Sequence, residues 1–388
     1  MATYTGTVRR ESKQLSLWKN QPSTKTREVP IDKILLAIVL GLTVFGLLMV
    51  YSASAMLADK LHNDQFHFFV RQGMWAVVGL FGMAMTMKID YRLYKKRAFI
   101  LFALYMTIVL LCAVFFFPKV NNAHRWILFK GFSLQPSEVA KLALVAFLAY
   151  YLEKYANRVE DYKKVFIPTA VTTLLIVGLI GAQPDLGTAL MIFITFAVVL
   201  YQACVPIRHL ATLAIPVVPA LVGMLVFVPW RLQRLLDFLN PWKNEQTSSY
   251  QVVQSLIAVG SGGINGLGYS QGKQKLFFLP SPHADFIFGV IGEELGLIGS
   301  IALVAAFGAF AWRGFKAARH APDRFGNLLG TGLTVLITAQ AFFNISVALS
   351  LVPTKGIPLP FISAGGSSLA ITLAACGILL NISKHEGA

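Results

Sequence analysis

Runs of apolar residues, each about twenty residues long, alternate with short polar segments along the chain after residue 30. A run of about this length can cross the roughly 30 Å hydrocarbon core of a bilayer as an α-helix. The pattern therefore predicts ten transmembrane helices, of which the fourth is short and the fifth and sixth lie close together. The predicted spans are 34–53, 69–87, 98–117, 137–152, 165–182, 186–205, 210–228, 286–312, 328–350 and 367–382.

The composition supports the same class. Of the 388 residues, 56% are hydrophobic and only 13% are charged, and a water-soluble domain needs more polar cover than that. We expect an all-α integral membrane protein with a tail at 1–30 and one membrane domain at 31–383. The polar tail leads directly into a full-length span, so it is expected to be retained, with the first span acting as an uncleaved anchor.

The distribution of basic residues predicts the orientation. The net charge of +16 would indicate nucleic acid as a partner of a soluble protein, but here the lysines and arginines cluster before the first span and after the second, fourth and eighth. With ten spans these segments share one side, which the positive-inside rule assigns to the cytoplasm. Both termini are then cytoplasmic, and the large loop between helices 7 and 8, residues 229–285, is extracytoplasmic.

The extracytoplasmic loop is too long to be a simple connector. Its segment SYQVVQSLIAVG is typical of an amphipathic helix at the membrane surface. The glycine-rich GSGGINGLG at 260–268 lacks the preceding strand and following helix of a dinucleotide fingerprint. Turns with positive φ angles explain it better than a phosphate-binding nest does.

Neither cysteine nor histidine spacing indicates a metal site or a disulfide. Cys112, Cys204 and Cys376 all lie in apolar runs, where they are expected as small buried hydrophobic residues. His62 and His67 are five residues apart in a loop, which is a weak metal-binding signal. The spacing therefore assigns no metal ligand.

Five ionisable residues border the spans at the predicted outward face, where such groups usually pair or line a wet cavity. Asp185 precedes a helix start, which favours an N-cap over a catalytic role. Arg71 could snorkel to the interface or bind a ligand. Glu138 and Lys141 share a helix face as an ion pair of structural or functional use. Asp285 stands at the outward start of the eighth span.

Other residues of interest lie within the last spans. Glu293 and Glu294 are one to two turns deeper than Asp285, where hydrogen bonding between helices is the preferred role. The sequence GGSS opens the last span, so Ser367 or Ser368 is expected as a helix cap, and the free N–H groups there could receive an anion.

A stripe of glycines runs below Asp285 along the predicted eighth span. At about 100° per residue, Gly289, Gly292, Gly296 and Gly299 fall on the same side as Asp285. Such a stripe permits close helix packing or the passage of a long lipid tail, and packing is slightly favoured. A surface carboxylate, nearby cations and a groove would suit a substrate with a polar head, a phosphate linkage and a lipid tail.

Several segments also carry a family resemblance. They are QPSEVAK, QPDLGTAL, NPW, YQVVQSLIAVGSGG, GLGYSQGKQKLFFLP, HADFIFGVIGEELG and PTKGIPLPFISAGGSS. These resemble the signature segments of the SEDS family of peptidoglycan glycosyltransferases over residues 32–382. FLNPWKNEQTSSYQ and GLGYSQGKQKLFFLP are more similar to the cell-division branch than to the elongation branch. Ala284 stands where Thr or Asn is usual and Ala364 where Tyr is usual, which bears on local substrate contacts.

The resemblance implies that the protein polymerises lipid II, an undecaprenyl-pyrophosphate-linked disaccharide pentapeptide, into glycan strands. The reaction would take place at the outer face of the bacterial cytoplasmic membrane during septal cell-wall synthesis. A class B penicillin-binding protein and other division proteins are the implied partners. The family's proposed essential carboxylate maps onto Asp285, which suits a general base.

With lipid II as the implied substrate, the predicted substrate-binding residues are Arg71, Glu138, Lys141, Lys355 and Ser367. Basic residues of this set, or a divalent cation such as Mg²⁺ or Mn²⁺, would offset charge on the departing pyrophosphate. The alternatives are a lipid II flippase, which would be expected to place its site near the midplane, and a structural scaffold, in which Asp285 would be dispensable.

Overall fold

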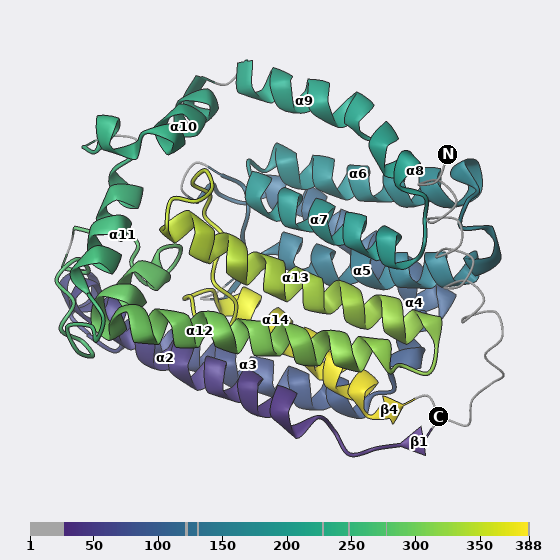
Figure 1. Cartoon of the computed structure of the whole chain (residues 1–388), viewed down its shortest axis with the longest axis horizontal. Helices are drawn as coiled ribbons and strands as arrows, with labels where there is room; N and C mark the ends of the chain where they lie inside the picture. The colour runs from purple at the N-terminus through teal and green to yellow at the C-terminus, as the bar shows by residue number, and fades with distance from the viewer. Residues whose placement is uncertain are drawn as a thin grey trace, which may run out of the picture.

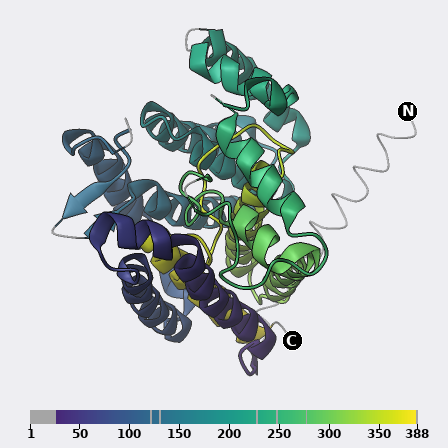
Figure 2. The same ribbon diagram turned by 90° about the vertical axis from the view of Figure 1, so that its left-hand side faces the viewer.

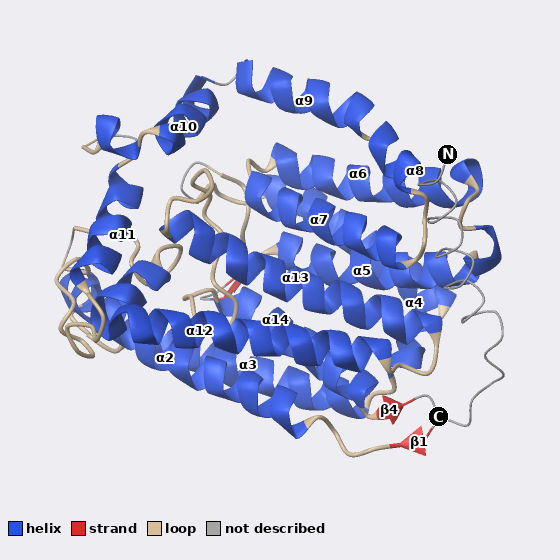
Figure 3. Ribbon diagram, in the orientation of Figure 1, coloured by secondary structure: helices blue, strands red, loops and turns tan. Residues whose placement is uncertain are grey.

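The computed structural model describes residues 27–120, 123–129, 132–226, 229–246, 249–276 and 278–386, and most of these residues are helical (Figure 3). The helices are α2 (Lys33–His62), α3 (His67–Lys88), α4 (Arg97–Ala113), α5 (Pro136–Lys154), α6 (Ile167–Ala182), α7 (Leu186–Gln202), α8 (Ile207–Thr212), α9 (Ala214–Val226), α10 (Pro229–Leu239), α11 (Tyr250–Ser261), α12 (Ile287–Arg319), α13 (Arg324–Ala348) and α14 (Gly366–Ser383). Short helical turns occupy Tyr91–Lys95, Val114–Phe116, Ala156–Arg158, Tyr162–Phe166 and Pro241–Asn244. Two-residue strands β1 (Arg27–Glu28) and β4 (His385–Glu386) pair, as do β2 (Ile127–Phe129) and β3 (Phe132–Leu134).

Helices α13 and α14 form the centre of the bundle. In their most apolar windows 78% and 67% of residues are buried, against 22–39% in the other long apolar helices. Figures 1 and 2 show α14 enclosed between α3 and α12. The outer helices therefore present large apolar surfaces outward, which only a hydrocarbon environment satisfies. The chain is a multi-pass membrane protein.

The number of spans stays a prediction. Among the described residues, seven helices are long and apolar enough to cross a membrane. Ten would require α5, the 17-residue α7 and the predicted seventh span as well. That seventh span is not one helix, because α8 ends at Thr212 and α9 begins at Ala214. Pro216 cannot donate to the Thr212 carbonyl four residues earlier, which explains the break.

Helix α9 stands apart from the bundle and continues into α10 at its outer corner (Figures 1 and 2). Helix α11 is the element expected from SYQVVQSLIAVG, and the helix itself is confirmed. Its buried face packs against α12 and α13, and its predicted position at the membrane surface stays a prediction. Ser255 of that face donates a hydrogen bond to the Ala348 carbonyl at 2.9 Å.

Ion pairs tie the basic loops together at one end of the bundle. Lys95 pairs with Glu153 at 2.8 Å, Arg92 with Asp323 at 3.3 Å and Arg313 with Asp32 at 2.6 Å. Strands β1 and β4 pair at the same end (Figure 1). That this end is cytoplasmic stays a prediction from the positive-inside rule, and tail residues 1–26 lie outside the described residues.

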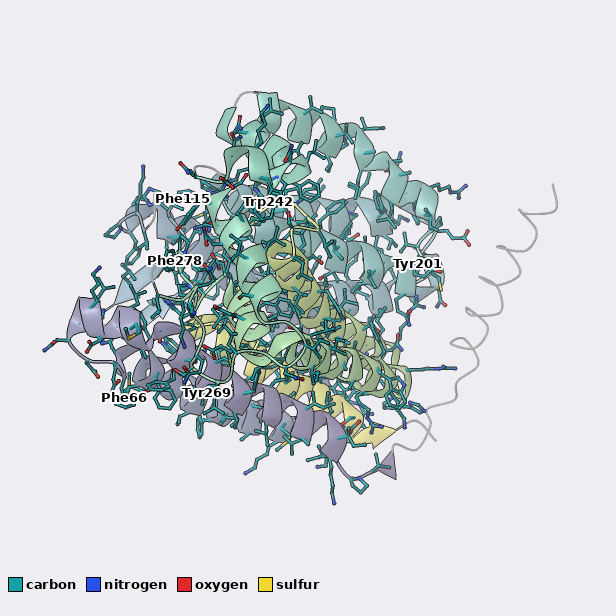
Figure 4. The ribbon with its side chains drawn as sticks, turned by 60° about the vertical axis from the view of Figure 1, so that its left-hand side comes forward. Phe66, Phe115, Tyr201, Trp242, Tyr269 and Phe278 are labelled. Atoms are coloured by element: carbon teal, nitrogen blue, oxygen red, sulfur yellow. The ribbon has the colours of Figure 1, made fainter. Side chains whose placement is uncertain are left out.

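Some exposed aromatic side chains lie at the ends of the bundle. Figure 4 shows Phe66, Tyr269, Phe278 and Trp242 toward one end and Tyr201 toward the other. All are at least 44% exposed, and other exposed aromatic side chains, such as Phe81, lie along the outer helices. Tyrosine and tryptophan of membrane proteins are enriched at the two membrane–water interfaces, and Tyr201, Trp242 and Tyr269 agree with that preference.

The predicted glycine stripe is wrong at Gly296, because α12 is interrupted there. Gly296 has φ 63° and ψ −160°, so the helical phase below Gly292 does not continue. The glycine-rich segment 260–268 bonds to the interrupted backbone on both sides of the break. Before the break, the N–H groups of Leu267 and Gly268 donate to the carbonyls of Glu293 and Glu294. After it, the N–H groups of Leu297 and Ile298 donate to the carbonyls of Gly263 and Ile264. Positive φ angles at Gly263, Gly266 and Gly268 confirm the turn interpretation of this segment.

The upper glycines face α11. A Cβ added to Gly289 would lie 2.8 Å from Ser255 Oγ, and one added to Gly292 would lie 2.9 Å from Val259 Cγ2. Two helices can approach this closely only where a side chain is missing. The structure thus favours helix packing over a groove for a lipid tail.

Candidate active site

Asp285 lies in the turn that precedes α12, at the end of the bundle opposite the basic loops. Three consecutive carbonyls of this turn accept hydrogen bonds from other segments. The Ala364 N–H donates to His283 O at 2.8 Å, the Ser363 hydroxyl donates to Ala284 O at 2.5 Å, and Asn344 donates to Asp285 O at 2.8 Å. The backbone that carries the carboxylate is therefore held on both sides.

The carboxylate itself is only partly exposed and lies against Gly356. A Cβ at Gly356 would come within 2.6 Å of Asp285 Oδ2, so the close approach needs glycine at this position. Burial raises the pKa of the Asp285 carboxyl, the Arg125 guanidinium opposes that rise, and the nearby Asp185 carboxylate adds to it. A carboxylate with a raised pKa is a stronger base.

Arg125 is a site residue that sequence reasoning missed. Its guanidinium donates to Pro184 O at 2.5 Å and to Gln183 O at 3.3 Å, which joins the loop before the β2–β3 hairpin to the turn before α7. A single arginine in an outward loop gave no periodic or motif signal. The fold alone brings it close to Asp285.

Asp185 is confirmed as the N-cap of α7. Its carboxylate accepts hydrogen bonds from the Thr188 N–H at 3.3 Å and the Thr188 hydroxyl at 2.9 Å. It also accepts one from Gln135 Nε2 at 3.2 Å. These bonds fix a second buried carboxylate beside Asp285 and Arg125.

The two glutamates beyond Asp285 hold the loop that leads to it. Glu294 pairs with Lys275 at 2.6 Å and accepts from Ser52 Oγ at 2.7 Å. Glu293 accepts the backbone N–H groups of Lys273 at 2.7 Å and Gln274 at 3.1 Å. The predicted hydrogen bonding between helices is present in the bond from Ser52 of α2 to Glu294. Most partners of the two glutamates, however, belong to the loop between α11 and α12.

Comparison with known proteins identifies the architecture around this site. A family model described as cell cycle protein, covering FtsW, RodA and SpoVE, matches residues 32–388. The chain belongs to this family. The SEDS resemblance read from the motifs is thereby confirmed.

Relatives and solved structures agree with that assignment. A probable peptidoglycan glycosyltransferase FtsW of Geobacter metallireducens is 42% identical and covers 91% of this chain and 95% of its own. Stage V sporulation protein E of Bacillus subtilis is 38% identical, over 93% and 99%. A chain of a peptidoglycan synthase complex shares 28% identity with a TM-score of 0.75, over 92% and 98%. RodA of Thermus thermophilus shares 26% identity with a TM-score of 0.66, over 92% and 97%.

Glu138 and Lys141 of α5 form a buried ion pair rather than an open binding surface. Lys141 Nζ lies 2.8 Å from Glu138 Oε1 and 2.8 Å from Gln340 Oε1, and both charged side chains are at most 4% exposed. Gln340 in turn donates to Pro358 O at 2.9 Å, in the segment that contains Gly356. Lys141 is therefore buried and paired with protein groups, and its predicted contact with the pyrophosphate stays a prediction.

The remaining predicted substrate contacts differ in position. Arg71 is exposed and donates to Ser133 Oγ at 3.3 Å. Lys355 is half-buried and adjoins Gly356, so it is next to Asp285 along the surface. Ser367 is not a cap, because α14 begins at Gly366 after Gly365, and its hydroxyl accepts the Gln135 N–H at 3.2 Å.

His283 is a second residue that the sequence did not single out as functional. Its ring packs on Phe68 of α3 at 4.7 Å between centroids, and burial lowers the pKa of the imidazole to about 4. The ring is therefore neutral, and within the described residues its Nδ1 has no hydrogen-bond partner. A buried unsatisfied nitrogen two residues before the carboxylate is a potential ligand contact.

The described residues contain no group of three or more His, Cys, Asp or Glu side chains suited to a metal. The rings of His62 and His67 stack at 3.8 Å between centroids, and these two histidines belong to no group of three possible metal ligands among the described residues. The arrangement around Asp285 can accept a proton at a carboxylate and offers the cations of Arg125, Lys355 and Arg71 on the same end of the molecule.

Proposed function

We propose that this protein uses the peptidoglycan glycosyltransferase activity of its family to polymerise lipid II at the outer face of the bacterial cytoplasmic membrane during septal synthesis. Asp285 is the general base. The single observation that supports this most is its carboxylate, partly exposed, with a pKa raised by burial and a backbone anchored through three successive carbonyls.

In the proposed reaction, Asp285 takes the proton of the acceptor sugar hydroxyl. The hydroxyl oxygen forms a bond to the anomeric carbon of the donor, and the bond from that carbon to the pyrophosphate oxygen breaks. Fixed cations stabilise the charge that develops on the leaving pyrophosphate. Arg125, Arg71 and Lys355 take this role, and Glu138 with Lys141 holds the segment around Gly356 through Gln340.

A divalent cation fits part of this site. Asp285 and Asp185 are hard oxygen donors, and Mg²⁺ or Mn²⁺ is commonly held by one or two carboxylates together with substrate phosphates. When bound, such a cation would neutralise charge on the pyrophosphate. Arg125 lies between the same segments and supplies positive charge there from the protein itself.

A class B penicillin-binding protein and other division proteins are the proposed partners. The related synthase complex couples polymerization with crosslinking. A polymerase that works at the outer face needs a crosslinking enzyme on that same face. The end of the bundle that carries Asp285, α10 and α11 is the one that such a partner would meet.

The test is polymerisation of lipid II by purified protein with and without its penicillin-binding partner. Asp285→Asn keeps the side-chain volume and removes the basicity, so the rate of glycan formation should fall by about 10² to 10⁴. Asp64→Asn is the control, because Asp64 is an exposed aspartate in the α2–α3 connection at the same end. A wild-type rate for Asp285→Asn would contradict the base assignment. Movement of lipid II across vesicles without polymer from wild type would favour a flippase.

A further inference from the structure

A second pocket lies at the far end of α12 from Asp285. It has a volume of about 100 Å³ and is lined by the residues just before α2, the last turns of α12 and the end of α14 with β4. Figure 1 shows this corner beside the β1–β4 pair. It is a helix length away from the active site, so the polymerase chemistry does not account for it.

The lining is polar and has an excess of positive charge. Arg313 and Asp32 form an ion pair at 2.6 Å and cancel one another. Lys316 also lines the pocket and has no ion-pair partner among the described residues. One uncompensated ammonium in a polar recess favours an anionic ligand.

Two histidines also line the pocket. His320 Nδ1 donates to the Lys316 carbonyl at 2.8 Å, and His385 Nδ1 donates to the Asn381 carbonyl at 2.9 Å. Because Nδ1 of each ring carries the proton, Nε2 is an acceptor, which suits a hydroxyl group of a ligand rather than a phosphate oxygen. Together with Lys316, these rings offer three nitrogen contacts from two helix ends.

The position of the pocket distinguishes a lipid from a free anion. Trp312, Lys316 and His320 are spaced four residues apart on α12 and therefore share one face. Trp312 is 67% exposed. An exposed tryptophan on an apolar helix marks the membrane interface. A ligand held by Lys316 and His320 can then continue along this face into the apolar layer.

We propose that this pocket binds the phosphate-bearing headgroup of an anionic phospholipid. The phosphate contacts the Lys316 ammonium, headgroup hydroxyls donate to Nε2 of His320 and His385, and the acyl chains lie over Trp312. Basic pockets between helix ends on the cytoplasmic side are suited to such headgroups. Because the pocket joins α2, α12 and α14, an occupied site ties the first and last parts of the membrane domain together.

The test uses the purified full-length protein in a neutral detergent and measures binding by native mass spectrometry. The probes are dioctanoyl phosphatidylglycerol, dioctanoyl phosphatidylcholine and inorganic phosphate. Lys316→Gln removes the lining ammonium, and His320→Gln removes one of the lining imidazoles. Arg319→Gln is the matched control, because Arg319 is an exposed cation on the same last turn and does not line the pocket.

We expect saturable binding of phosphatidylglycerol that Lys316→Gln weakens about fivefold and Arg319→Gln leaves unchanged. His320→Gln should weaken it too, and both variants should retain the thermal stability of the ligand-free protein. If Arg319→Gln weakened phosphatidylglycerol binding as much as Lys316→Gln does, general surface charge would explain the binding, and the proposed site would be wrong. Equal affinity for phosphatidylcholine, or for inorganic phosphate, would overturn the anionic-lipid assignment.

Discussion

Replacing Glu294 by glutamine should detach the loop that carries Asp285. Glu294 and Lys275 form an ion pair at 2.6 Å with side chains that are 0% and 5% exposed. The ammonium also contacts Ser52 Oγ at 2.9 Å and Ser270 Oγ at 3.3 Å. Lys275 belongs to the segment between α11 and α12, ten residues before Asp285.

The expected cost follows from what Glu294→Gln leaves behind. The Lys275 ammonium keeps its hydroxyl contacts but loses the carboxylate with which it pairs among the described residues, in a buried place. Removing one partner of a buried pair typically costs about 3–5 kcal/mol. The double variant Lys275→Met/Glu294→Gln removes both charges and should be less destabilised than the sum of the single variants, with a coupling energy of about 0.5–3 kcal/mol.

The free energy of unfolding is measured by denaturant titration of the purified variants, together with lipid II polymerisation. Lys95→Gln serves as the control, because Lys95 pairs with Glu153 at 2.8 Å but is 44% exposed, and such pairs contribute about 0.2–1 kcal/mol. If Glu294→Gln is no less stable than Lys95→Gln, the buried pair does not anchor the loop. Activity should be lost with stability and return in the double variant.

Three other expectations concern pH, packing and topology. Because only unprotonated Asp285 accepts a proton and its pKa is raised, initial polymerisation rates should fall on acidification at a pH above the ordinary aspartate pKa of about 4. Arg125→Gln should move this fall to higher pH, and identical pH profiles would refute the reasoning. Gly292→Leu should destabilise the protein by about 1–3 kcal/mol in a thermal or denaturant assay through overpacking against α11, and unchanged stability would contradict the packing. A cysteine at Glu245 should react with an impermeant reagent from outside and one at Asp161 should not, and reversed labelling would refute the orientation.

Much of the architecture could be predicted from the sequence because each membrane helix is specified by its own segment. Every backbone group in hydrocarbon must bond within its own segment, so apolar runs predict helices before any tertiary contact is known. The long helices other than α8 and α9 lie close to the predicted runs, whereas α10 was not predicted. The basic loops, the N-cap role of Asp185 and the family motifs were also local features.

What local patterns did not provide were contacts between distant segments. The break at Gly296 exists because residues 263–268 bond to the interrupted backbone of α12, so helical phase alone gave the wrong stripe. Lys141 looked available near the outward face, yet α13 covers it through Gln340. Arg125 looked unremarkable until the fold placed it beside Asp285.

The sequence by itself determined the class of protein, its helices and the carboxylate at the centre of its site, because hydrophobic length, charge position and short motifs act within one segment. Only the tertiary structure decided which charges meet. The electrostatic environment of Asp285 depends on Arg125 and Asp185, which are 160 and 100 residues away along the chain. Burial and Coulomb interactions depend on distance in space, and packing sets that distance.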